Sequence, residues 1–168
     1  EELRIAEQIG YVEQQIFNLT YLAAAHRGAG NLEECKTYAE RALALTEREN
    51  EHSFAGTAYA NLGWVAWRRN NLRLANTLNQ KAISKWSQYY PFRWYGLWTM
   101  IAIGLSTLKF AEAIEYARGL KVPGQQVFAK EGDELLASAI EAAEKGDKAK
   151  SESLLMKAVE WAMENHFL

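Results

Sequence analysis

The chain has 168 residues, of which 49% are hydrophobic and 24% are charged, and this is enough for one domain with a packed core. With only 2 prolines and many Ala and Leu residues, the composition favours helices over strands. No apolar run is long enough to span a membrane and no secretory leader opens the chain, so we expect a cytoplasmic protein without membrane contact. A single cysteine, Cys35, excludes an internal disulfide and a cysteine-based zinc site. The start without Met predicts a fragment of a larger protein.

The net charge of −2 hides a segregation of charge along the chain. Residues 52–111 contain no Asp or Glu but 7 Lys and Arg, whereas the remainder carries 12 basic and 21 acidic residues. The same central stretch holds 12 of the 20 aromatic residues. The overall acidic balance argues against a nucleic-acid partner, although a basic and aromatic centre is also typical of single-strand binding. The same centre favours an acidic or aromatic protein partner.

Apolar periodicity predicts a succession of helices, and the first of them resembles the second helix of an earlier, truncated hairpin. The longest irregular stretch, residues 121–133, contains the helix-breaking Pro123-Gly124 pair. The predicted helices span residues 2–10, 12–28, 31–48, 52–69, 72–87, 92–107, 109–120, 131–145 and 147–165.

The sequence also repeats itself. Three segments align: AGNLEECKTYAERALAL, RNNLRLANTLNQKAISK and KGDKAKSESLLMKAVEW, and LKFAEAIEYARGLKV fits between the last two. Gly30, Asn70 and Gly146 stand in the turn that precedes the helix, as expected for a left-handed turn residue. The period is 40 residues at first and about 38 later. We therefore predict a string of helical hairpins.

The first helix of each hairpin shows apolar or small residues at i, i+3, i+4 and i+7, the spacing of one buried face. In the second hairpin these residues are Tyr59, Leu62, Gly63 and Ala66. Their counterparts are Leu19, Leu22, Ala23 and His26, then Leu97, Met100, Ile101 and Gly104, and finally Leu135, Ser138, Ala139 and Ala142.

The segment NLGWVAWRRNNLRLANTLNQKA resembles a tetratricopeptide repeat, with Leu62, Gly63, Ala75 and Ala82 at the positions of that family's pattern. The first hairpin departs from this pattern with Ala23 and Cys35, and the third lacks the turn glycine. The resemblance implies an all-α, right-handed superhelical solenoid of antiparallel helix hairpins with about four repeats. Because stacked hairpins contact mainly their neighbours, we expect residues 1–168 to form a single repeat domain.

The lengthened repeat is similar to the C-terminal repeat regions of bacterial regulators that join an ATPase to a nucleotide cyclase or a DNA-binding output. In such proteins the repeats sense or recruit, and catalysis lies elsewhere in the polypeptide. The resemblance thus implies a non-catalytic protein-interaction or scaffold module within a signalling protein.

No motif for catalysis, cofactor binding or metal binding is recognisable in the sequence. A phosphate-binding loop is absent, and His26, His52 and His166 lack metal-ligand spacing. We expect no enzyme, cofactor or metal. His26 is predicted to have a hydrogen-bonded packing role, and Cys35 to be an inert core thiol.

The candidate site lies on the first helices, opposite their buried faces. At about 100° per residue, Asn61, Trp64 and Arg68 fall on that opposite side. The resemblance implies that it lines a concave groove for a peptide or partner helix, with room around Trp64 because Ala24 and Ala102 occupy the matching positions. The candidate partner-binding residues are Phe17, Arg27, Asn61, Trp64, Trp67, Arg68, Tyr95 and Trp98.

Several alternatives to a protein-binding groove stay open. The same rings could fill the interior of the solenoid, because aromatic residues at helical spacing often belong to a core. The site could instead sense a small anionic effector, and the ends of the solenoid, residues 2–10 and the helix with Trp161, could mediate homo-oligomerisation. A clamp for acidic chaperone tails is not predicted, because Ala60 and Trp64 stand where that clamp has Lys and Asn.

Overall fold

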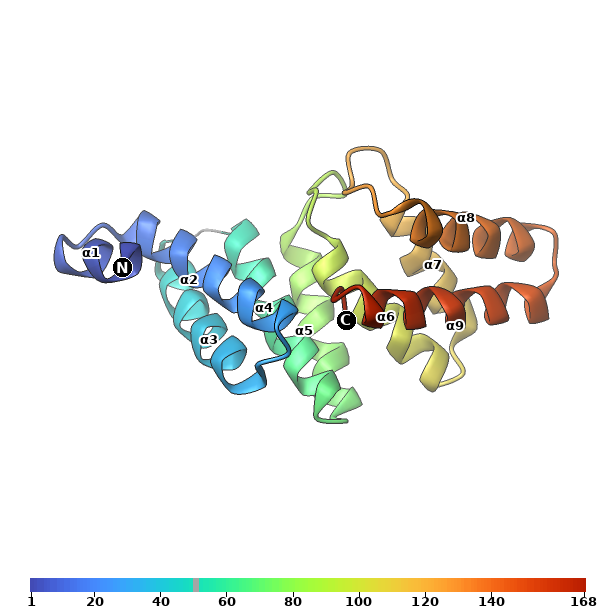
Figure 1. The fold of residues 1–168 in the computed structure, drawn as a ribbon, viewed down its shortest axis with the longest axis horizontal. Helices are drawn as coiled ribbons and strands as arrows, with labels where there is room; N and C mark the ends of the chain where they lie inside the picture. The colour runs from blue at the N-terminus through green and yellow to red at the C-terminus, as the bar shows by residue number, and fades with distance from the viewer. Residues whose placement is uncertain (50–51) are drawn as a thin grey trace. The chain divides into compact units, whose positions relative to one another are not determined.

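The computed structural model describes residues 1–49 and 52–168, and all regular secondary structure in these ranges is α-helical. Every predicted helix is present, with ends within two residues of the predicted ones, so the all-α repeat fold is confirmed. The helices are α1 (Glu2–Gln8), α2 (Val12–Gly28), α3 (Leu32–Glu49), α4 (His52–Arg68), α5 (Leu72–Lys85), α6 (Trp94–Ser106), α7 (Phe110–Leu120), α8 (Lys130–Glu144) and α9 (Lys148–Glu164) (Figure 1).

The turns inside the four hairpins share one backbone conformation. Each contains a residue with positive φ, and the N–H of the next residue donates to a carbonyl five positions back, which is a Schellman turn. Leu108 takes this conformation in the third hairpin, where the sequence has no turn glycine. The four hairpins therefore turn at equivalent positions of the repeat, including the one whose sequence lacks a turn glycine. The turn residues are Gly30 (φ 77°), Asn70 (58°), Leu108 (58°) and Gly146 (77°).

The chain divides into two compact units, Glu1–Trp86 and Ser87–Leu168. In the first unit each helix contacts the next along the chain, and the two first helices, α2 and α4, also contact each other. This succession is the one expected for stacked hairpins. The right-handed superhelix and the single domain over residues 1–168 stay predictions.

Gly63 of the Leu-Gly pair lies where α4 and α5 approach closely. A Cβ on this residue would lie 2.3 Å from Nδ2 of Asn79, which donates a hydrogen bond of 2.8 Å to the Ala75 carbonyl. Only glycine therefore leaves room for the buried amide of the second helix.

Tyr59 lies at the edge of the first unit's core and not within it. Its ring is only half-buried, because the hydroxyl donates a 2.7 Å hydrogen bond to Glu47 of α3. This hydrogen bond is the main reason that the pKa of Tyr59 is raised. Of the predicted buried face, Gly63 and Ala66 are buried, whereas Tyr59 and Leu62 are only half-buried.

Two hairpins place a tryptophan directly against a glycine. A Cβ on Gly56 would lie 2.3 Å from Nε1 of Trp86, which donates to the Ser53 carbonyl at 2.9 Å. In the fourth hairpin, a Cβ on Gly132 would lie 2.5 Å from the ring of Trp161. In both hairpins a large ring, just after α5 in one and on α9 in the other, thus occupies the space that the glycine leaves.

The second unit contains consecutive contacts from α6 to α9, and α6 also contacts α9. Its interior is an aromatic cluster, to which both the segment before α8 and the residues after α9 contribute. Ser138, predicted on the buried face, is exposed, because it lies on the open side of α8. The aromatic cluster comprises Trp94, Trp98, Phe128, Trp161 and Phe167.

Within residues 1–49 and 52–168, no helix has the length and apolar character that crossing a membrane requires.

Candidate functional site

One face of the first unit carries most of the predicted site residues. On α4, Asn61, Trp64 and Arg68 are spaced three and then four residues apart, so they lie on one side of the helix. α2 packs beside α4 and extends this side with its own aromatic and basic residues. We call this surface the α2–α4 face; it comprises Phe17, Tyr21 and Arg27 of α2 and Phe54, Asn61, Trp64 and Arg68 of α4.

Two arginines stack on Trp64 and form the arginine end of this face. The Cζ atoms of Arg27 and Arg68 lie 5.5 and 5.4 Å from the centroid of the Trp64 ring, within the range of cation–π contacts. Arg27 is buried, whereas Arg68 is exposed. The structure therefore brings three of the predicted site residues together.

Among the described residues, no acidic side chain neutralises the positive charge of Arg68 at this end. Within the described part of the chain it forms no ion pair, although its neighbour Arg69 pairs with Glu33. Ring stacking holds the Arg68 guanidinium without satisfying its N–H donors, and guanidinium groups bind carboxylate or phosphate well.

The expected open space around Trp64 is absent. The ring has no accessible surface, because two guanidinium groups stack on it, and Asn61 is equally buried. Both amide atoms of Asn61 and the indole N–H of Trp64 lack a hydrogen-bond partner among the described residues. Leaving such a buried group unpaired costs about 1–3 kcal/mol, so these polar groups are an exception to normal packing.

The accessible apolar surface lies at the other end, which we call the aromatic end. The ring centroid of Phe17 lies 4.4 Å from that of Tyr21 and 6.5 Å from that of Phe54, so the three rings join α2 to α4. Phe17 is 42% and Tyr21 55% exposed. Phe54 was not predicted, although extending the spacing of Asn61, Trp64 and Arg68 back along the helix would have found it.

Tyr95 and Trp98 belong to the second unit. Trp98 is fully buried, and its ring lies 5.5 Å from Phe128 and 6.3 Å from Trp161. Tyr95 stacks on Trp94 at 3.8 Å. Packing accounts for the positions of both residues, and their contact with a partner stays a prediction.

Trp67 is half-buried at the end of α4, beside the turn. Among the described residues, no ring contact joins Trp67 to the arginine end, and its part in partner binding stays a prediction.

His26 and Cys35 have the packing roles predicted from the sequence. The His26 ring stacks on Tyr38 at 5.3 Å, and its Nδ1 lies 3.3 Å from Nδ2 of Asn31. Cys35 is fully buried, and burial raises its pKa to about 11. Among the described residues, no group of three His, Cys, Asp or Glu side chains could hold a metal ion.

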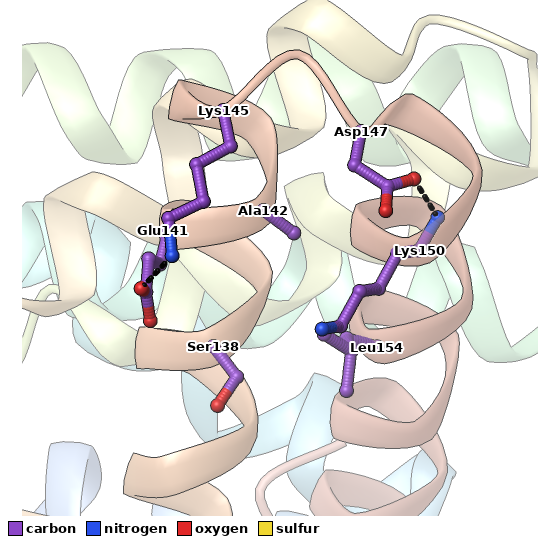
Figure 2. Close-up of a pocket in the computed structure, with 7 residues that line it drawn as sticks. All are labelled: Ser138, Glu141, Ala142, Lys145, Asp147, Lys150 and Leu154. Carbon is purple, nitrogen blue, oxygen red and sulfur yellow. Dashed lines mark hydrogen bonds and ion pairs between the residues drawn. The ribbon is translucent and has the colours of Figure 1, made fainter.

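A pocket of about 470 Å³ lies between the end of α8 and the start of α9 (Figure 2). Figure 2 shows Lys145 paired with Glu141, and the Asp147 carboxylate accepting a 3.0 Å hydrogen bond from the Lys150 backbone N–H. The ion pair lowers the pKa of Glu141 and raises that of Lys145. The pocket thus contains two acidic and two basic side chains, of which Glu141 and Lys145 pair with each other.

Residues 15–86, which span α2 to α5, match the family model of the tetratricopeptide repeat. This match supports the family resemblance for the first unit, which contains the α2–α4 face. Tetratricopeptide repeats generally mediate protein–protein interaction or scaffolding, and the family is typically non-catalytic. No curated protein and no solved structure shows significant similarity to the chain.

Proposed function

We propose that this protein is a non-catalytic interaction module and that its first unit binds a segment of another protein along the α2–α4 face. The observation that carries this proposal is the exposed Arg68, stacked on Trp64 and without an ion pair in the described chain, on the same face as the exposed Phe17 and Tyr21. Aromatic and arginine side chains are the residues that contribute most to protein interfaces.

We further propose that the module acts in the cytoplasm as the repeat region of a larger bacterial signalling or regulatory protein. The long repeat period of 38–40 residues supports this context. The bound segment then belongs to a partner or to another part of the parent protein.

Peptide selection tests the binding function directly. A library of random displayed peptides, long enough to cover the face, is selected on the immobilised wild-type chain, and the recovered peptides are synthesised. Their affinities are then measured for wild-type protein, Phe17→Ser and Arg68→Glu. We expect each substitution to weaken binding by about tenfold, since a lost hot-spot contact costs more than about 1 kcal/mol.

The matched control is Arg73→Glu, which makes the same charge change at an exposed position of α5, outside the α2–α4 face. We expect this variant to bind as the wild type does. If selection yields no binding peptides, or if all variants bind equally, the α2–α4 face is not a protein-binding site.

A second candidate function is the sensing of a small anionic effector. It is favoured by the two guanidinium groups on one indole ring, which suit a carboxylate or a phosphate. Calorimetric titration with di- and tricarboxylates and with nucleotides tests it. Heat that disappears in Arg68→Glu supports this function, and no heat with any of these compounds excludes them as effectors.

A further inference from the structure

We infer that the α2–α4 face recognises an extended segment through its two ends, taking an aromatic side chain at one end and a carboxylate four or five residues away at the other. This inference rests on the proposed function and specifies its ligand. It follows from the charge, the accessibility and the separation of the two ends.

The arginine end selects a carboxylate. The Arg68 side chain is exposed, its Cζ lies 5.4 Å from the centroid of the Trp64 ring, and this cation–π contact leaves its N–H groups available to a ligand. The fully buried Trp64 is a platform that restricts Arg68 to few orientations and thereby lowers the entropy cost of binding. Arg27, stacked on the same ring, adds a second positive charge.

The composition of the helix that carries Arg68 strengthens that selection. Residues 52–86, which include α4 and α5 of the first unit, contain no Asp or Glu. No carboxylate on α4 therefore competes with a ligand for Arg68. An acidic side chain of the bound segment would supply the missing partner.

The aromatic end selects a ring or another large apolar side chain. The Phe17 ring already contacts the rings of Tyr21 and Phe54, and Phe17 and Tyr21 expose about half of their surface. A further ring could pack edge-to-face on them without disturbing the core. No acid or base takes part in these ring contacts, so the expected attraction is burial of apolar surface.

The two ends are ten residues apart on both helices: from Phe17 to Arg27 on α2, and from Phe54 on α4 to Trp64, over whose ring the Arg68 guanidinium lies. A helix rises 1.5 Å per residue, so this separation is about 15 Å. An extended chain covers about 3.3 Å per residue, and about 15 Å therefore corresponds to four or five residues of a bound segment.

The middle of the face carries polar groups that such a segment could satisfy. Among the described residues, Asn61 has no partner for its amide donor or its acceptor, the pair of groups needed to bind one peptide unit of an extended backbone. Because Asn61 is fully buried, this contact requires the face to open. The contacts with Phe17, Tyr21 and Arg68 do not require such opening.

The test uses the peptides recovered by the selection described above. We expect an aromatic residue and an Asp or Glu to be enriched four or five positions apart. In synthetic peptides that keep the composition, moving the acid to two or eight positions from the aromatic residue should weaken binding by about tenfold. A preference that is independent of spacing would overturn the inference.

Charge reversal tests the role assigned to Arg68. Replacing the acid of the peptide by Lys should weaken binding to the wild type but strengthen binding to Arg68→Glu, and Arg73→Glu should behave as the wild type does. If the Lys peptide does not recover affinity for Arg68→Glu, the carboxylate does not bind at Arg68. Peptides that bind through Phe17 and Arg68 without this spacing would contradict the inference and leave the proposed function intact.

Discussion

At the scale of single residues, Cys35 shows what burial does to a titrating group. Burial raises the pKa of its thiol from 9.0 to about 11. A raised pKa means that the folded state holds the proton more tightly than the unfolded state does. The contribution of the Cys35 thiol to the free energy of unfolding is therefore fully present below about pH 9 and is lost as the pH rises from about 9 to about 11.

This shift predicts slow thiol chemistry in the folded protein. At about pH 8 the thiolate fraction should be about a hundredfold smaller than in the unfolded chain, because the pKa differs by about two units. We expect an aromatic disulfide reagent to react at least about a hundredfold more slowly in buffer than in concentrated urea. Equal rates under the two conditions would show that Cys35 is accessible in the native state.

Gly56 is a second residue whose neighbours determine its identity. Gly56→Ala places a methyl group 2.3 Å from Trp86 Nε1 and forces the ring away from its hydrogen bond with Ser53. Overpacking and the lost hydrogen bond together should lower the free energy of unfolding by about 2–4 kcal/mol. Urea denaturation followed by circular dichroism measures this change.

The control is Gly28→Ala, at a helical glycine with no atom within 4 Å of an added Cβ. We expect this variant to be as stable as the wild type or slightly more stable, because alanine favours a helix over glycine. If both alanine variants unfold at the same urea concentration, the contact with Trp86 does not constrain Gly56.

The sequence predicted the side of α4 on which Trp64, Asn61 and Arg68 lie, because that depends only on helical geometry. It could not predict that Trp64 is fully buried while Arg68 is exposed. Accessibility depends on what packs over a helix face, and side chains distant in sequence determine this. The stacking of Arg27 on Trp64 joins two residues 37 positions apart and has no local sequence signal.

At the scale of elements, the hairpin turns were predictable where Gly or Asn marks them. Leu108 is the exception, because a leucine gives no signal for a left-handed turn, yet it adopts φ 58°. The neighbouring helices impose this conformation, since Lys109 N–H must still reach the Gly104 carbonyl, at 2.7 Å. A leucine in this conformation is strained by about 1–2 kcal/mol.

Replacing this leucine should therefore stabilise the protein. Leu108 is 85% exposed, so Leu108→Gly relieves the strain and loses little packing. We expect a gain of about 0.5–1 kcal/mol in the free energy of unfolding after the greater flexibility of glycine in the unfolded chain is subtracted. Thermal unfolding of the two proteins measures this gain.

The reverse change provides the control. Gly146 has φ 77° in the equivalent turn and open space around an added Cβ, so Gly146→Ala adds strain without a clash. It should lose about 1 kcal/mol. A destabilised Leu108→Gly would mean that the exposed leucine makes contacts that outweigh its strain.

The end of α9 was predicted as an ordinary helix end, but the residues after it complete the aromatic cluster. Phe167 lies 5.4 Å from Trp161 and 5.0 Å from Phe128. Phe128 itself comes from a stretch predicted only as irregular, because periodicity shows helices and gives no information on loop residues that pack inward. Its burial could not have been predicted from the repeat.

Phe167→Ala should disrupt this cluster. We expect a loss of about 2–3 kcal/mol and a weaker near-ultraviolet circular dichroism signal, because the neighbouring rings lose a fixed packing partner. Met163→Ala, at a half-exposed position of α9, should change neither quantity appreciably. An unchanged near-ultraviolet signal in Phe167→Ala would show that Phe167 does not order the other rings.

At the scale of the whole molecule, the repeat period predicted four hairpins because each hairpin is a local unit with its own turn. It did not predict the contact of α6 with α9 or the division into two compact units. A repeat alignment identifies which helices are equivalent, but contacts between non-consecutive helices depend on packing angles that the alignment does not contain.

The uneven distribution of charge predicts how association depends on salt. The acid-free stretch carries seven positive charges, and Arg68 is exposed within it. We expect the association rate constant for an acidic peptide to fall severalfold between about 0.05 M and 0.5 M salt, and that of a neutral peptide to stay constant. Stopped-flow anisotropy measures both, and a salt-independent rate for the acidic peptide would argue against electrostatic steering.

The packing of Trp86 against Gly56 limits which pairs of residues can occupy these two positions in related hairpins. Forty residues earlier, the same two positions hold Ile16 and Thr46, both buried, so the larger side chain has moved from the second helix to the first. What is preserved between the two hairpins is the combined volume of the pair. In descendants of a duplicated hairpin, these two sites should therefore change together, and a substitution at one should open the way for a compensating one at the other.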